Sequence, residues 1–177
     1  MNLLVIGGSL LGTIVGGLIA YNAAQGVARK TWQRERQEKL DSLRREALAA
    51  ALEWIEPMRN AEAWASGLVM SSIRGEVDDE DFQKKFPYLL GELVKRDLTG
   101  SQRAVLPQDV YARGHNIIRE LEDLRCLGLK YGAQARVMGK PMSGFPECSA
   151  KLDAIKRQIT ELEDELRNEF KGTFKLD

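Results

Sequence analysis

The stretch LDAIKRQITELEDELRNEF, residues 152–170, carries the clearest hydrophobic pattern in this chain of 177 residues. Lysine, arginine, glutamate, aspartate and glutamine occupy most positions between its apolar residues. The apolar residues recur at steps of three and four: Leu152, Ile155, Ile159, Leu162 and Leu166, with Phe170 close to the same line. This heptad repeat predicts an amphipathic helix that buries one stripe against other helices.

Three further stripes with similar spacing precede it. The first comprises Leu43, Ala47, Ala51, Ile55, Met58, Ala65 and Leu68. A shorter one comprises Phe82, Phe86, Leu89, Leu90, Leu93 and Val94. The third contains several small residues, which favour close packing against a neighbour: Val110, Gly114, Ile117, Leu121, Leu124, Gly128, Tyr131, Ala135 and Met138.

Prolines and glycines divide these stripes. Pro57 lies within the first stripe and lacks a backbone donor, which predicts a kink or a break near Glu56. The acidic segment 75–82 ends that helix, and Pro87 is expected near the start of the next. Segments 98–109 and 139–147 contain glycine, serine and proline and are predicted to be a turn and a loop.

The predicted fold class is all-α: one N-terminal transmembrane helix followed by an antiparallel bundle of about four helices. Stripes in four helices joined by short turns can be buried against one another within one chain. The alternative is a dimeric coiled coil formed by the long first helix and the heptad-rich last helix. The predicted boundaries are an anchor at 1–26, a basic juxtamembrane helix at 27–39, a bundle at 40–171 and a tail at 172–177.

The N-terminal stretch MNLLVIGGSLLGTIVGGLIAYNAAQG, residues 1–26, has two interpretations. One is a strand leading into a dinucleotide-binding loop, but Ser9 stands where the middle glycine of the G-x-G-x-x-G fingerprint is needed. The acidic second strand that this fold needs is also replaced by the charged helical sequence after Ala28. A Walker-type phosphate loop fails because Thr13, not lysine, follows Gly12.

The other interpretation is a membrane span, because residues 3–24 contain no charged residue or histidine. At about 1.5 Å per residue, this run is roughly 30 Å long as a helix, the thickness of the hydrocarbon core. Gly8, Gly12 and Gly16 fall on one face, where small residues permit close helix packing and homo-oligomerisation. A cleaved signal peptide is less consistent, because it would have a basic start and a shorter apolar region.

Positive charge lies on the C-terminal side of this predicted span. Arg29, Lys30, Arg34 and Arg36 lie there, whereas the N-terminal side has no side-chain cation. The positive-inside rule then predicts a single-pass protein of the cell (inner) membrane, with the N-terminus outside and the C-terminal domain in the cytoplasm. The cations also favour contact with anionic membrane lipid.

The rest of the sequence predicts no catalytic, cofactor-binding or metal site. Lys and Arg number 26 and balance 26 Asp and Glu, so nucleic acid is not an expected partner. Cys126 and Cys148 lack a metal-binding spacing and fit a reducing compartment. His115 is the only histidine, which leaves zinc and di-iron sites short of ligands.

Two other segments could suggest chemistry. The acidic run 161–166 lacks the spacing of an EF-hand loop, so a solvated helix face is expected. Lys140 and Ser143 share a loop, but the sequence shows neither a base nor an oxyanion site for them. Trp54 and Trp64 are expected to pack in the bundle; either one, if exposed, would indicate a partner groove.

The sequence therefore favours a membrane-anchored helical interaction module without intrinsic catalysis, which recruits or senses a cytoplasmic protein. The alternative is an accessory subunit of a larger membrane complex, such as an enzyme, a transporter or an anti-phage assembly, with catalysis on another chain. An exposed apolar patch on a stable bundle would favour recruitment. Instability without another membrane chain would favour the subunit.

Overall fold

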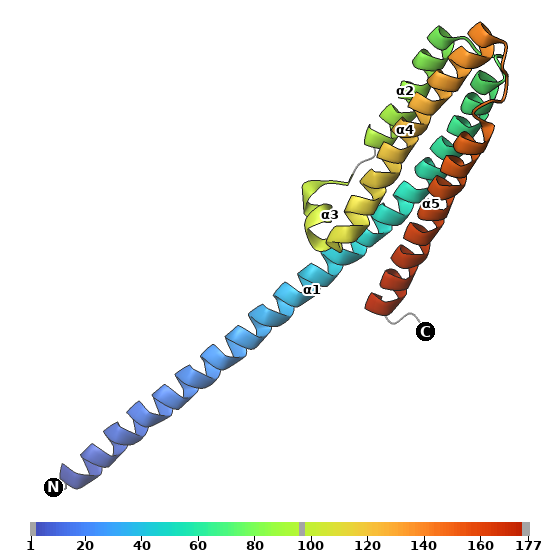
Figure 1. Cartoon of the computed structure of the whole chain (residues 1–177). Coiled ribbons are helices and arrows are strands. Elements are labelled where there is room, and N and C mark those ends of the chain that lie inside the picture. The colour runs from blue at the N-terminus through green and yellow to red at the C-terminus, as the bar shows by residue number, and fades with distance from the viewer. Residues whose placement is uncertain (1–2, 96–97, 175–177) are drawn as a thin grey trace. The chain divides into compact units, whose positions relative to one another are not determined.

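The computed structural model describes residues 3–95 and 98–174, with side chains for residues 24–88, 90–91, 93 and 98–172. Within these ranges five helices follow one another: α1 (Leu3–Ile73), α2 (Asp79–Lys95), α3 (Gly100–Val105), α4 (Gln108–Met138) and α5 (Phe145–Phe174) (Figure 1). No strand occurs in the described ranges. The prediction of an all-α chain is therefore confirmed.

The chain divides into two compact units, Met1–Ser42 and Leu43–Asp177. The second unit is a bundle in which the C-terminal part of α1 lies beside α2, α4 and α5 (Figure 1). Successive long helices run in opposite directions. α1 and α4 therefore run in the same direction. The hydroxyl of Ser72, near the end of α1, donates a hydrogen bond to the carbonyl of Gly128 on α4 at 3.0 Å. The predicted stripes are thus buried within one chain.

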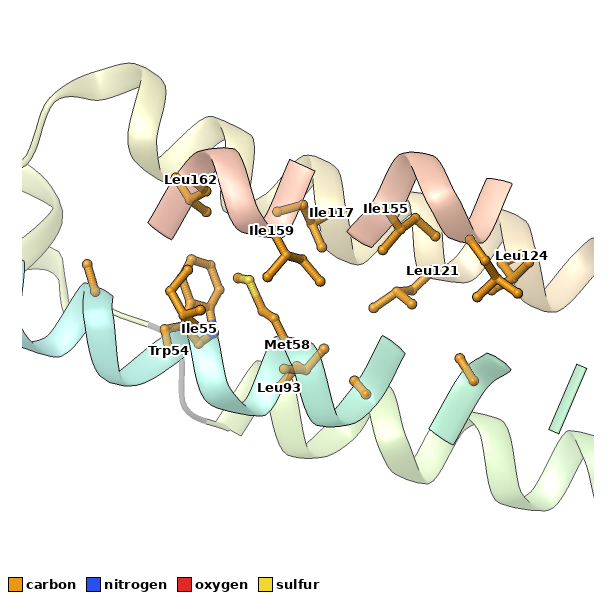
Figure 2. Close-up of a cluster of buried hydrophobic side chains, with 14 of the residues drawn as sticks. Trp54, Ile55, Met58, Leu93, Ile117, Leu121, Leu124, Ile155, Ile159 and Leu162 are labelled. Atoms are coloured by element: carbon orange, nitrogen blue, oxygen red, sulfur yellow. The ribbon is translucent and has the colours of Figure 1, made fainter. Parts of the chain in front are cut away.

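The core lies where the apolar stripes of four helices meet (Figure 2). Met58 of α1, Phe82 of α2, Leu121 of α4 and Ile155 of α5 are all fully buried. The stripe predicted on the last helix is confirmed: its five aliphatic residues are buried, and Phe170 is half-buried. Burial of one such side chain contributes about 1.5–3 kcal/mol relative to its exposure, so these contacts dominate the stability of the bundle.

Glycines on α4 bring that helix close to its neighbours. Gly114, Gly128 and Gly132 are buried. A Cβ atom added at Gly128 would lie 2.6 Å from Cζ of Phe82 and 3.1 Å from Cγ2 of Val69. Carbon atoms need about 3.5–4.0 Å, so only hydrogen fits at this position. The small residues that the sequence placed on this stripe therefore serve close helix packing.

One buried carboxylate links two helices at their polar edge. Glu163 of α5 is 9% exposed and accepts hydrogen bonds from Arg167, at 2.7 Å, and from Arg59 of α1. Both arginines keep more than half of their side-chain surface in solvent. This arrangement satisfies the buried charge without removing the guanidinium groups from water.

Both prolines lie inside helices. α1 continues through Pro57, so of the predicted kink or break near Glu56 the break does not occur. The prediction that Pro87 lies near a helix start is wrong, because Pro87 lies inside α2. Pro57 removes only the hydrogen bond to the carbonyl of Glu53, a residue on the exposed side where water can replace it. Burial of residues on both sides of Pro57, including Trp54 and Met58, holds the helix together.

A short helix interrupts the predicted turn at 98–109. α3 begins after Thr99, whose side chain accepts from the backbone N–H of Gln102, while the Gln102 side chain accepts from the N–H of Thr99. This reciprocal pair is a capping box, which supplies partners for donors at a helix start. The described residues therefore contain one short helix in addition to the four long helices that build the bundle.

The prediction of the third stripe is partly wrong at the end of α4. Met138 is 63% exposed and Tyr131 is half-buried, whereas Gly132, which the stripe omitted, is buried. The helix ends one residue after Val137, and Gly139 adopts a left-handed conformation (φ 61°) that stops it. The stripe loses its partner there because α4 reaches the end of the bundle.

The described part of the chain contains no helix that is both long enough and apolar enough to cross a membrane. The predicted span at 3–24 lies, except for Ala24, in residues whose side chains are outside the described part. The same holds for Gly8, Gly12 and Gly16. The helical bundle is thus the confirmed part of the predicted fold, and the transmembrane helix is not.

Candidate functional site

The predicted basic residues lie on an exposed helical segment, residues 24–40, of the first unit. Arg29 and Arg36 are two turns apart on one face, and Lys30 and Arg34 are one turn apart on another. Arg34 pairs with Glu38 at 3.0 Å, and the guanidinium of Arg36 lies 5.5 Å from the centre of the Trp32 ring.

These cations are neighbours along the helix, but they do not converge on one point. Exposed pairs such as Arg34 with Glu38 contribute less than about 1 kcal/mol, so the arginine can exchange one acidic partner for another. The segment therefore provides diffuse positive charge, which suits a charged surface better than a small ligand.

His115 belongs to an aromatic cluster rather than to a group of ligands. Its ring lies 4.5 Å from the centre of Tyr111 and 5.8 Å from the centre of Trp54, both with edge-to-face geometry. The residues that the structure describes contain no group of three His, Cys, Asp or Glu side chains placed to hold a metal ion. The histidine thus packs against the side of α1 that carries Trp54.

The two cysteines differ in environment and are both free thiols. Cys126 on α4 is exposed, whereas Cys148 on α5 is buried. Burial raises the pKa of the Cys148 thiol, and the charge of neighbouring Glu147 acts in the same direction. The thiol of Cys148 is therefore held in its protonated, poorly nucleophilic form.

The acidic run at 161–166 is divided among different partners. Glu163 bonds to Arg59 and Arg167, whereas Glu165 pairs with Arg113 of α4. In the loop before α5, the Ser143 hydroxyl lies 3.3 Å from the side-chain oxygen of Gln134. These side chains hold the bundle and its loop together.

An open apolar groove on the outer surface of α1 and α2 is the most distinctive feature of the described surface. It has a volume of about 1030 Å³. Trp64 and Tyr88 contribute its large aromatic side chains and are 69% and 70% exposed. Its lining residues come from both helices and the connection between them: Ala63, Trp64, Gly67, Leu68, Ser71, Val77, Lys84, Lys85 and Tyr88.

The two tryptophans of this helix have opposite environments. Trp54 is 3% exposed and fills the space above Gly114, whereas Trp64 projects into the groove. The packing expected for both is confirmed for Trp54 and wrong for Trp64. A rotation of about 100° per residue explains the difference: it places Trp54 within the buried stripe of α1 and Trp64 well to one side of that stripe.

Lysines provide the charge at this groove. Lys84 pairs with Glu80 at 2.6 Å and Lys85 with Asp81 at 3.0 Å, each one helical turn away on α2. All four side chains are more than half exposed, so the pairs are weak. Among the described residues that line the groove, none is acidic. The groove thus combines an apolar floor with two lysines at its edge, each paired with an acidic residue that does not line the groove.

Comparison with known proteins adds no identification. The chain matches no protein-family model, no curated protein and no solved structure.

Proposed function

We propose that this protein is a single-pass, membrane-anchored interaction module whose helical bundle recruits or senses another protein in the cytoplasm, without catalysis of its own. The observation that carries the proposal is the groove at Trp64 and Tyr88 on a bundle whose core is already well packed. Exposed apolar surface that folding does not bury is typical of protein interaction sites. Trp and Tyr are also the residues that most often dominate binding energy at such sites.

The proposed anchor rests on the sequence of residues 3–24. The absence of charge over this length suits the hydrocarbon core, and the basic segment that follows suits the cytoplasmic leaflet. The exposure of Arg29, Lys30, Arg34 and Arg36 leaves them accessible to anionic headgroups. We propose that the bundle is thereby held near the inner face of the membrane, where a cytoplasmic partner can reach it.

Cell fractionation tests the anchor. The full chain should remain with membranes after alkaline carbonate extraction, and deletion of residues 3–24 should release it. A reporter fused after Asp177 should behave as cytoplasmic. Release of the full chain by carbonate would refute the anchor, and export of the reporter would refute the proposed orientation.

Affinity purification from membranes then tests recruitment. The full chain should retain a defined protein that Trp64→Ala loses, whereas the control Phe145→Ala, at an exposed aromatic residue outside the groove, should keep it. Unfolding of the purified chain when other membrane proteins are removed would instead favour the accessory-subunit alternative. Equal retention by both variants would refute the groove as the recruiting surface.

A further inference from the structure

We infer that the groove between α1 and α2 binds an acidic amphipathic helix of the partner protein, with the apolar face of that helix on Trp64 and Tyr88 and its carboxylates at Lys84 and Lys85. This inference rests on the proposed recruiting function and specifies the chemistry of the recruited segment.

The floor of the groove fits a helix. Ala63 and Gly67 lie one turn apart on α1, and a Cβ atom added at Gly67 would have no neighbour within 4 Å. Glycine inside a helix costs about 1 kcal/mol relative to alanine, and packing within this chain does not require it here. Small residues on an open face allow another helix to approach closely, and Trp64 and Tyr88 flank that approach.

The length of the groove is consistent with the same occupant. From Ala63 to Ser71, α1 advances about 12 Å, or roughly two turns. Helices that bind in grooves present apolar anchors at i, i+3 or i+4, and i+7, which cover a similar length. Two turns of an amphipathic helix can therefore place its anchors along this floor.

The charge at the groove selects an acidic helix. Both charged lining residues, Lys84 and Lys85, are cationic, and their present partners Glu80 and Asp81 hold them only through exposed ion pairs. A carboxylate on the incoming helix can share these lysines at little cost. A basic helix would bring like charges together, which is unfavourable.

The described segments of this chain do not supply that helix. The exposed segment 24–40 has five cations and only two acids, so its charge opposes the lysines of the groove. The exposed face of α5 is acidic near Glu161 and Asp164, but that part of the helix lacks large exposed apolar residues. Neither segment combines an apolar anchor face with acidic flanks, which points to a different protein.

Selection from a phage-displayed peptide library tests the inference. The peptides are amphipathic helices with fixed apolar positions and with flanks randomised over acidic, basic and neutral residues. The bait is the full chain in phosphatidylcholine nanodiscs. Acidic peptides should be enriched about tenfold or more over basic ones. Lys84→Glu combined with Lys85→Glu should reverse that preference, whereas Lys140→Glu with Lys171→Glu, the same change in net charge at exposed sites elsewhere, should not.

A second variant blocks the groove without disturbing the core. Gly67→Leu places a side chain in open space, so circular dichroism should be unchanged while enrichment is lost. Enrichment that ignores charge or survives Gly67→Leu would overturn the inference. Sedimentation that shows dimers dissolved by Gly67→Leu would also overturn it, because a second copy would then occupy the groove. Failure of the chain to enter nanodiscs would refute the anchor instead, and the selection would still be readable in buffer.

Discussion

The close approach of α1, α2 and α4 around Gly128 can be tested with one methyl group. Gly128→Ala adds a Cβ atom 2.6 Å from Cζ of Phe82 and 3.1 Å from Cγ2 of Val69. Both neighbours are fully buried, so neither can move aside without disturbing the core. Relief of the contact with Phe82 needs a shift of about 1 Å, because carbon atoms prefer separations of about 3.5–4.0 Å.

Gly67→Ala provides the matched reference. Gly67 also lies inside a helix, but an added Cβ there meets no atom within 4 Å. Each substitution gains about 1 kcal/mol of helix propensity, whereas overpacking costs about 1–3 kcal/mol only at Gly128. The difference in free energy of unfolding between the two variants therefore isolates the cost of overpacking. Gly67→Ala should be more stable than the natural chain. Gly128→Ala should be less stable than Gly67→Ala by about 1–3 kcal/mol.

Urea unfolding of the full chain, followed by far-ultraviolet circular dichroism and by tryptophan fluorescence, measures this difference. Because Trp54 is buried in the bundle, the change in tryptophan fluorescence reports unfolding of the bundle, and this transition gives the difference in stability. Phe82→Leu should partly rescue Gly128→Ala, because the smaller side chain vacates the position of the ring tip. Equal stability of Gly128→Ala and Gly67→Ala would refute the close packing around Gly128 and Phe82.

Three further outcomes follow from burial and from the glycine pattern. Burial is the main cause of the raised pKa of Glu62, so the ionised carboxylate lowers the stability of the fold as pH rises through the folded pKa. Glu62→Gln should therefore raise the melting temperature more at neutral pH than at pH 4. A disulfide reagent should modify Cys126 rapidly in the folded chain and Cys148 only after denaturation, as measured by mass spectrometry. In an energy-transfer assay on the isolated predicted span, Gly12→Ile should weaken association far more than Leu10→Ile; equal signals would leave the glycines without a packing role.

Hydrophobic periodicity predicts most of the bundle because burial imposes the pattern directly. Ile155, Ile159 and Leu162 follow the heptad spacing and all lie in the core (Figure 2). In the first stripe, Ala51 and Met58 are likewise buried. Such positions need only the geometry of a helix and the presence of a partner surface, and the sequence contains both.

The prolines show where local rules fail. Proline inside a helix costs about 3 kcal/mol locally, yet α1 and α2 continue through Pro57 and Pro87. Burial of several side chains on either side, such as Trp54 and Met58 around Pro57, outweighs a cost of this size. That balance depends on contacts between helices, which a single sequence does not list. The capping box of Thr99 and Gln102 is different, because its T-x-x-Q spacing was readable from the sequence.

The groove was only partly predictable. The angular position of Trp64, to one side of the buried stripe of α1, indicates an outward direction once that stripe is known. The sequence does not reveal that Tyr88 and two lysines of α2 come to lie beside it, because this depends on how α2 folds back along α1. Residues more than twenty positions apart thus form the site, and only the packed structure brings them together.

Glycine has a different meaning at each place where this chain uses it within a helix. Gly128 is buried and lets α4 approach two neighbours of its own chain, whereas Gly67 faces an open groove. The same residue type at Gly12 is predicted to face another helix within the membrane. In every case the absence of a side chain reduces the distance at which a second element can pack, at a cost in helix propensity of about 1 kcal/mol. At Gly128 this cost is offset by close packing against Phe82 and Val69 within the bundle. At Gly67 no packing within the described chain offsets it. A contact from outside the chain would supply the missing benefit, which is why the groove, rather than the glycine alone, carries the proposal of a partner helix.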